Sequence, residues 1–251
     1  MRGDILKKKL MVLCAVAIMI STCLTGCKMN SGKIRFGSAG IGGTYQIFGD
    51  TFANLISSKS KKYNIEVKTT AGSAANLRLL SKDYIQMAVA QMDLINDAYN
   101  RTGIFENDKK YQGYRAVASL YTEACQIVVP ADSDIQSMDD LEGKKVCIGE
   151  EESGTEQNAL QILNAYGLNE RLVDTVNLNY TDAAKKLKSG DIDAFFCTAG
   201  VQTTVINELS KQCKIRLVSL DQKGVSRLKK SYKFYTEYTI PAGTYVNQTK
   251  E

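Results

Sequence analysis

Histidine and tryptophan are both absent from this chain of 251 residues, and proline occurs only at Pro130 and Pro241. Without histidine there is no Ser-His-Asp or Cys-His nucleophile, no HExxH zinc motif and no imidazole acid–base catalyst. The remaining composition is ordinary, because 44% of the residues are hydrophobic and 24% are charged. These proportions are typical of a globular protein with a buried core and argue against disordered, collagen-like and coiled-coil chains.

The first 26 residues have the pattern of a secretory leader. A positively charged start precedes an apolar run from Leu10 to Ile20, which is too short to cross a bilayer as a helix. The tetrad Leu24-Thr25-Gly26-Cys27 resembles the lipobox of bacterial lipoproteins, in which the cysteine is acylated. We therefore expect residues 1–26 to be a lipoprotein signal peptide and residues 27–32 a tether. A retained membrane anchor is the alternative.

Removal of this leader changes the charge and the cysteine content. The formal charge of the whole chain is +5, and the leader carries four positive charges and one negative charge, so the mature chain keeps +2. This small excess gives no reason to expect a nucleic-acid partner. Cys147 and Cys197 lie in apolar stretches, where buried free thiols are favoured over disulfides. Four cysteines remain once Cys27 is acylated: Cys125, Cys147, Cys197 and Cys213.

Strand-like and helix-like segments alternate along the rest of the chain. Helices are expected from Thr44, as an N-cap residue, and over residues 181–189, which Gly190 ends. The alternation is typical of α/β layering with mostly parallel sheets. The short apolar runs that predict strands are Lys33–Phe36, Ile65–Lys68, Met87–Ala90, Gln126–Pro130, Lys145–Ile148 and Ala194–Cys197.

Two groups of strand-to-helix loops predict two lobes with a cleft between them, since ligands bind at the carboxyl ends of parallel strands. We expect lobe I over residues 33–126 and lobe II over residues 127–218, with Gln126–Pro130 as the crossing. Residues 219–251 are expected to return to lobe I.

Two helix starts are candidate anion sites. The glycine-rich run Gly37–Gly43 lacks the lysine of a phosphate-binding loop, so it predicts either capture of an anion by backbone N–H groups or a tight turn. Ser153 or Thr155 is the expected cap of a second helix, with Glu156 in its first turn. The three glutamates Glu150–Glu152 are consecutive, so their side chains diverge and do not suggest paired catalytic carboxylates.

Six segments taken together resemble one family. In order and spacing they resemble the TAXI family of solute-binding receptors for tripartite (TRAP) transporters, from about residue 33 to the end. The resemblance implies an α/β fold of the type II periplasmic-binding-protein architecture, with two lobes and a ligand cleft between them. The segments are SAGIGGTYQIFG (38–49), AGSAANLRLL (71–80), VAQMDLINDAYNRTG (89–103), SGTEQNA (153–159), AFFCTAG (194–200) and YTIPAGTY (238–245).

The lipobox-like tetrad predicts a lipid at Cys27 that holds the protein at the outer face of the bacterial cytoplasmic membrane, and the resemblance to the TAXI family implies a receptor there. It would capture a small organic anion, a glutamate-like amino acid or a dicarboxylate, and deliver it to TRAP permease subunits with no cofactor or metal and no chemical step. The alternatives are a surface lipoprotein sensor, a truncated remnant that does not transport, and a carboxylate-dependent hydrolase.

The family's ligand-binding positions carry over to both lobes, with a cap or turn hydrogen bond as the alternative role for each hydroxyl. Arg78 and Arg115 are expected on the surface rather than as carboxylate clamps. The positions in lobe I are Ser38, Gly43, Thr44, Tyr45, Ser73, Asn76, Gln91, Asp93, Tyr121 and Glu123, and those in lobe II are Ser153, Gly154, Thr155, Thr198, Ala199 and Gly200.

The chain departs from the family at its end. Family members normally continue past the IPAGTY motif with a strand and helices that complete lobe I, whereas this chain ends at Glu251. We therefore expect the C-terminal part of lobe I to be truncated.

Overall fold

The computed structural model describes residues 33–110 and 112–251. The expected signal peptide, the tether and Cys27 lie outside these residues. The sheets and helices below lie in the compact unit Ile34–Glu251, apart from Lys33 at the start of the first strand. Within the described part of the chain, no helix combines the length and apolar character needed to cross a membrane.

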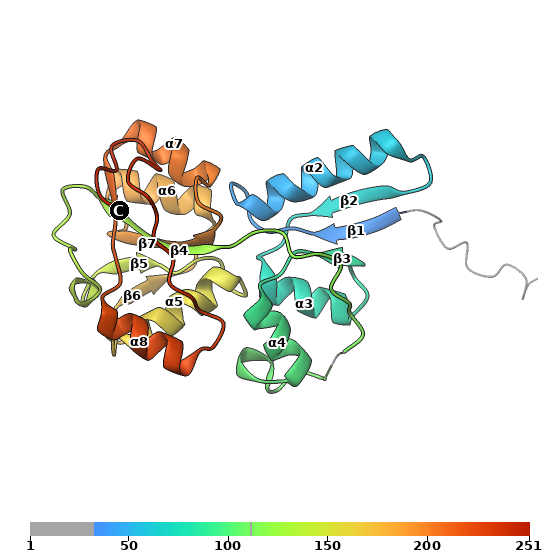
Figure 1. The fold of residues 1–251 in the computed structure, drawn as a ribbon, viewed down its shortest axis with the longest axis horizontal. Coiled ribbons are helices and arrows are strands. Elements are labelled where there is room, and N and C mark those ends of the chain that lie inside the picture. The colour runs from blue at the N-terminus through green and yellow to red at the C-terminus, as the bar shows by residue number, and fades with distance from the viewer. Residues whose placement is uncertain (1–32, 111) are drawn as a thin grey trace, which may run out of the picture. The chain divides into compact units, whose positions relative to one another are not determined.

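The first sheet has three strands in the order β2-β1-β3, and β1 and β3 are parallel. Helix α2 covers one face, where Phe48 and Phe52 pack 6.1 and 5.8 Å from the Phe36 ring, and α3 and α4 lie on the other side (Figure 1). The elements are β1 (Lys33–Gly37), α2 (Thr44–Lys59), β2 (Asn64–Lys68), α3 (Ser73–Ser81), β3 (Met87–Ala88) and α4 (Met92–Asn100), followed by a 3-10 turn, η1 (Gly103–Phe105).

The second sheet has five strands in the order β6-β5-β7-β4-β8. Strand β5 is parallel to β6 and β7, as expected, but β4 is antiparallel to both β7 and β8. The sheet is therefore mixed. The strands are β4 (Ala124–Pro130), β5 (Lys145–Cys147), β6 (Asp174–Val176), β7 (Ala194–Ala199) and β8 (Ile215–Leu217), and a 3-10 turn, η2 (Asp139–Leu141), precedes β5.

The expected crossing segment Gln126–Pro130 is an interior part of this sheet. It lies in β4, between β7 and β8, and Val128 and Val129 are fully buried. The irregular residues that precede Ala124 join it to the first sheet. The prediction of a crossing at 126–130 was wrong because an apolar run of this kind gains more from pairing on both edges than from spanning two lobes.

Four helices cover the second sheet. Helices α6 and α7 lie on one face, and α5 and α8 lie on the other (Figure 1). All six residues of β7 are buried, and because side chains alternate along a strand, Phe195 packs toward α6 and α7 while Phe196 packs toward α5. The helices are α5 (Gly154–Ala165), α6 (Tyr180–Ser189), α7 (Thr204–Gln212) and α8 (Gln222–Ser231).

The structure confirms some of the predictions for helix ends and buried cysteines and corrects one of them. Ser153 caps α5, as predicted, by accepting a hydrogen bond of 3.0 Å from the Glu156 N–H. Gly190 ends α6 with a left-handed φ of 79°. Thr44, however, is the first residue of α2, and Gly43 holds the N-cap position without a side-chain bond. Cys147 and Cys197 are buried free thiols, as expected.

Residues 219–251 pack on the second sheet, whereas we expected them to return to the first. Leu228 of α8 is buried in the core beside α5. Farther along, Tyr245 is 3% exposed and donates a hydrogen bond to the Gln126 side chain in β4. Because α8 and Tyr245 present apolar surface, they are stabilised where the five-stranded sheet offers a matching apolar face.

Asn76 ties together the loops at the carboxyl edge of the first sheet. Its side chain is fully buried, and its Nδ2 donates to the carbonyl oxygens of Ser38 (2.7 Å) and Val89 (2.9 Å). Its Oδ1 accepts from the Thr70 hydroxyl at 2.8 Å. One amide therefore satisfies polar groups from three loops.

We expect Asn76→Ala to lower the free energy of unfolding by about 3 kcal/mol, because each buried group that loses its partner costs about 1–3 kcal/mol. Urea unfolding of the full chain measures the change. Asn100→Ala, at an exposed position at the end of α4, is the control and should change stability by less than about 0.5 kcal/mol. If Asn76→Ala and Asn100→Ala lower the free energy of unfolding equally, the buried Asn76 amide does not stabilise these loops.

Candidate functional site

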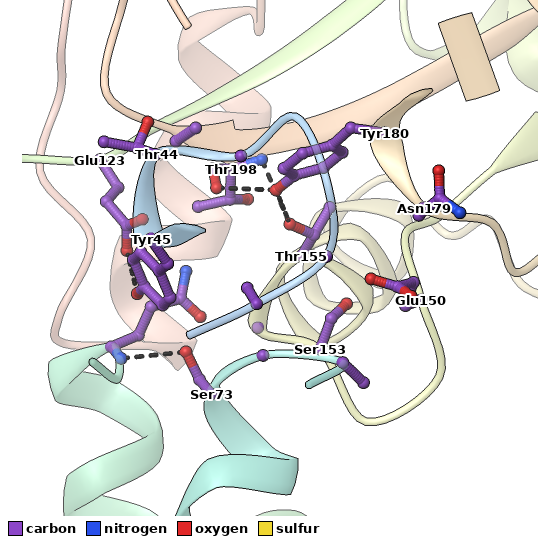
Figure 2. A pocket seen from close by; sticks show the side chains of 18 of the residues that line it. Thr44, Tyr45, Ser73, Glu123, Glu150, Ser153, Thr155, Asn179, Tyr180 and Thr198 are labelled. Atoms are coloured by element: carbon purple, nitrogen blue, oxygen red, sulfur yellow. Dashed lines mark hydrogen bonds between the residues drawn. The ribbon is translucent and has the colours of Figure 1, made fainter. Parts of the chain in front are cut away.

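A cavity of about 40 Å³ lies where loops at the carboxyl ends of the two sheets' strands meet. The loops after β1, β2 and β3 contribute from the first sheet, and the loop after β5 and the end of β7 contribute from the second. Figure 2 shows these side chains from close by. The lining residues are Ala39, Gly40, Gly43, Thr44, Tyr45, Ala71, Gly72, Ser73, Gln91, Glu123, Glu150, Ser153, Gly154, Thr155, Leu178, Asn179, Tyr180, Thr198 and Ala199.

Most of the residues expected to bind ligand lie on this one cavity, although they come from distant parts of the sequence. The expected residues that line it are Gly43, Thr44, Tyr45, Ser73, Gln91, Glu123, Ser153, Gly154, Thr155, Thr198 and Ala199.

Five expected residues lie elsewhere. Ser38 and Asn76 are fully buried beneath the loops, and their side chains bond to backbone carbonyls. Asp93 lies at the start of α4 and accepts hydrogen bonds from the Leu94 N–H and the Asn158 amide. Tyr121 and Gly200 line a second, larger hollow beside the first, of about 370 Å³.

Sequence reasoning missed the start of α6. Asn179 caps this helix by accepting from the Asp182 N–H at 2.9 Å, and Tyr180 is its first residue. The sequence analysis predicts a helix from Thr181, which is one residue too late. Asparagine is a favoured N-cap residue, so Asn179 was a signal for the earlier start. Both Asn179 and Tyr180 line the cavity.

Tyr180 joins the end of β7 to the first turn of α5 through a closed ring of hydrogen bonds (Figure 2). Its hydroxyl donates to the Thr198 carbonyl at 2.9 Å, and the Thr198 N–H donates to Thr155 Oγ1 at 3.3 Å. Because the single Tyr180 hydrogen is used in this way, the Thr155 hydroxyl must donate to Tyr180 Oη in the remaining contact. This ring fixes one wall of the cavity.

Glu123 and Tyr45 form the opposite wall. The Tyr45 hydroxyl donates to Glu123 Oε2 at 2.9 Å, and the Tyr45 ring lies edge-on to Tyr121, with 6.5 Å between centroids. Burial, the largest cause, and the charge of Asp93 raise the pKa of Glu123 to about 7, although hydrogen bonds from the Tyr45 and Gln91 side chains act to lower it. At neutral pH this carboxyl is therefore close to its midpoint.

The cavity contains acidic side chains and no cationic ones. Glu150 is the second carboxylate on it, and burial, followed by the charge of Asp182, raises the Glu150 pKa. None of the lining residues is lysine or arginine. Arg115 is exposed, as expected, but Arg78 pairs with Asp108 at 2.9 Å and with Glu152 at 2.8 Å, which corrects the expectation of a free surface side chain.

Several contacts hold the loops of the two sheets together around the cavity. Besides the Arg78–Glu152 pair, the Ala75 N–H donates to the Glu152 carbonyl at 3.1 Å. Gln91 Nε2 donates to Asn158 Oδ1 at 2.8 Å. Gly72 lies beside Ser153, and its φ of +132° is a backbone conformation that favours glycine.

Helices α2 and α5 both begin at the cavity. The first N–H groups of a helix have no partner inside the helix and carry a partial positive charge, so two such ends favour a negatively charged or carboxylate group. Thr44 and Ser73 add hydroxyls beside them. Across the residues that the structure describes, no cluster of acidic or cysteine side chains has the grouping needed to hold a metal ion.

A family model matches residues 36–251, which is most of the chain. The chain belongs to the NMT1-like family. This NMT1-like chain is also similar in fold to solved binding proteins. A binding protein of an ABC phosphonate transporter from Pseudomonas aeruginosa is 12% identical with a TM-score of 0.52, over 80% of this chain and 73% of that one.

Two further structures are similar. The alkanesulfonate-binding protein of Xanthomonas axonopodis pv. citri is 18% identical with a TM-score of 0.51, over 75% of this chain and 60% of its own length. A putative L-cystine ABC transporter protein of Listeria monocytogenes is 19% identical with a TM-score of 0.50, over 80% and 88%. The chain thus spans about 60% of the alkanesulfonate-binding protein. The expected fold, of the type II periplasmic-binding-protein class, is confirmed.

The raised pKa of Glu123 predicts a pH-dependent stability. The folded chain holds this proton more tightly than the unfolded chain, so the free energy of unfolding falls as the pH rises from about 4.5 to about 7. With about 1.4 kcal/mol per pKa unit, the shift from 4.5 to about 7 makes the Glu123 contribution at most about 3.5 kcal/mol. Glu123→Gln should remove this contribution, and urea unfolding at pH 4.5, 6 and 8 measures it.

Glu170→Gln, at an exposed position, is the control and should keep the wild-type pH dependence. If the Glu123→Gln variant loses as much stability between pH 4.5 and 8 as the wild type does, the Glu123 carboxyl is not the group that titrates.

Proposed function

We propose that the protein is an extracytoplasmic solute-binding receptor that captures a small solute in the described cavity and presents it to a membrane transporter. The observation that carries the proposal is the cavity itself, which has ligand-facing groups from the loops of both sheets. A solute can contact the loops of the first sheet and those of the second sheet at once only when the two sets of loops meet. A bound solute therefore shifts the population toward the conformation in which they meet. The receptor releases its solute unchanged, and no chemical step is involved.

The cavity best suits a solute that carries a carboxylate or a similar anionic group. The starts of α2 and α5 lie on the cavity, where the first N–H groups of a helix favour an anion, and Thr44 and Ser73 supply hydroxyls beside them. Similar structures include proteins described as binding alkanesulfonates or belonging to phosphonate and cystine transporters. These solutes also carry anionic groups.

We further propose that the receptor is of the TAXI type and works with TRAP permease subunits, with a glutamate-like amino acid or a dicarboxylate as its solute. The support is the set of six ordered sequence segments that resemble this family. The lipobox-like tetrad before Cys27 supports a mature protein anchored by lipid at the outer face of the bacterial cytoplasmic membrane.

Solute binding should raise the thermal unfolding midpoint of the full chain. A solute at about 100 times its Kd stabilises the folded state by about 2.7 kcal/mol, so a panel of amino acids, dicarboxylates, sulfonates and phosphonates should contain at least one stabilising class. Gly154→Ala should weaken binding of that class at least about tenfold, because the new methyl group collides with the Gln91 amide in the cavity.

The unliganded midpoint of the Gly154→Ala variant serves as its folding control. A folded wild-type chain that no member of the panel stabilises would contradict solute binding for these four classes.

The anchor has its own test. Cys27→Ser should move the protein from the membrane fraction to the soluble extracytoplasmic fraction, because no cysteine would then carry the lipid. Cys23→Ser, four residues earlier in the leader, should leave the protein on the membrane. If Cys27→Ser also stays on the membrane, the leader is retained as an uncleaved anchor.

A further inference from the structure

We propose that Arg78 and Glu152 are positioning residues, whose ion pair holds the two sets of loops together over the cavity and so slows the departure of a bound solute. Neither residue lines the cavity, so both act on the solute only through the position of the loops. The inference rests on the proposed function, because it concerns how long the cavity retains its solute. It is carried by a charged contact between α3 and the loop that precedes α5.

The two sheets are joined by little backbone. The turn η1, which follows the last helix of the first sheet, ends at Phe105, and β4 of the second sheet begins at Ala124. Residues 219–251 pack on the second sheet. Within the described residues the chain therefore passes between the sheets once, through the irregular segment before Ala124. A few residues of such a segment can absorb a hinge motion, so contacts between the loops decide how long the loops stay together.

Arg78 is held in place by neighbours on its own side of the cavity. Its Nε donates to Asp108 Oδ2 at 2.9 Å, and its Nη2 donates to the Ile104 carbonyl at 3.1 Å. Its Cζ lies 5.0 Å from the centre of the Phe105 ring. The remaining nitrogen, Nη1, donates to Glu152 Oε1 at 2.8 Å. Because the guanidinium is already ordered, this pair costs less side-chain entropy than an ordinary surface pair.

Glu152 offers two acceptors to the same helix. Besides the carboxylate that pairs with Arg78, its carbonyl oxygen accepts from the Ala75 N–H at 3.1 Å. Ala75 is the third residue of α3, where an N–H has no partner inside the helix. Glu152 has a φ of +64°, which is uncommon for a residue with a side chain. Backbone strain of this kind gathers at functional contacts, and here it lies at the point where the two sets of loops touch.

Within the described residues, opposite charges meet across the loops only at Arg78 and Glu152. Every other ion pair joins elements of one sheet, and the contact between Gln91 and Asn158 is between neutral amides. The Arg78 and Glu152 side chains are 25% and 47% exposed, so dissolved salt screens their attraction. The population in which the loops meet should therefore fall as the salt concentration rises.

Amide hydrogen exchange, followed by NMR on the unliganded full chain, tests the contact itself. The Ala75 N–H is protected while the loops meet, so its exchange rate follows the population in which they are apart. Raising NaCl from about 0.1 M to about 1 M shortens the Debye length from about 10 Å to about 3 Å. Ala75 exchange should then speed up about two- to fivefold, which corresponds to the worth of an exposed pair. The Asn76 N–H bonds to the Gly72 carbonyl, on the same side of the cavity, and should not respond.

Variants of Glu152 separate its charge from its hydrogen bond. Glu152→Gln retains an acceptor for Arg78 but no charge, so it should speed Ala75 exchange about two- to fivefold at about 0.1 M salt and abolish the salt dependence. Glu152→Asp keeps the charge, and aspartate tolerates a positive φ, so it should keep the salt dependence. Glu151→Gln, at the exposed neighbouring position, is the matched control and should behave as the wild type. Thermal unfolding reports that each variant is folded.

Release of a labelled solute tests the consequence for retention. The probes are radiolabelled L-glutamate, glutarate, ethanesulfonate and methylphosphonate, and dissociation is followed after dilution into unlabelled solute. For each probe that the wild-type chain binds, Glu152→Gln should speed dissociation about two- to fivefold, whereas Glu151→Gln should leave it unchanged.

Two kinds of result would overturn the inference, and they differ. If Ala75 exchange does not respond to salt, or if Glu152→Gln leaves dissociation unchanged, the ion pair does not govern retention, while solute binding stands. If the folded wild-type chain binds none of the four probes, the proposed function fails for their classes, and the role in retention fails with it.

Discussion

The account depends on the close approach of two loops, one before α3 and one before α5. Gly72 lies against Ser153 and has a φ of +132°, which L side chains rarely adopt, and the ion pair between Arg78 of α3 and Glu152 joins the same two segments. This contact brings the starts of α3 and α5 to one cavity. A residue with a Cβ at position 72 would strain the backbone there.

Helix starts and acceptor side chains lie together in this site. Glu123 accepts a hydrogen bond from Tyr45 in the first turn of α2, and the Gln91 side chain lies against Gly154, the first residue of α5. The proposed role is that of a receptor that binds its solute and releases it unchanged. The absence of histidine is consistent with such a role, because no proton needs to be moved.

Features that depend on neighbouring residues were predictable from the sequence. The strands around Phe36 and Val146, the Ser153 cap and the Gly190 stop follow from hydrophobic pattern and capping chemistry. Features that depend on distant pairing were not. The apolar run Gln126–Pro130 carries no mark of its antiparallel partners, and the apolar residues of α8 do not reveal which sheet they cover.

The candidate site shows the same difference between features that neighbouring residues determine and features that distant residues determine. Motif resemblance pointed to Tyr45, Gln91 and Glu123, but it could not reveal that burial raises the pKa of Glu123, since burial is known only when every neighbour is in place. Asn76 has the same polar character as these residues and yet is buried under the loops. Glu150 was noticed as one of three consecutive glutamates, but only the fold selects it from the three for the cavity.

Equilibrium dialysis of the full chain against radiolabelled amino acids, dicarboxylates, sulfonates and phosphonates tests the central claim most directly, which is that this cavity holds a small solute. The account predicts that the chain retains close to one label per molecule from at least one class, and that the same solute without the label displaces it. A folded chain that retains no label from any of the four classes would contradict it.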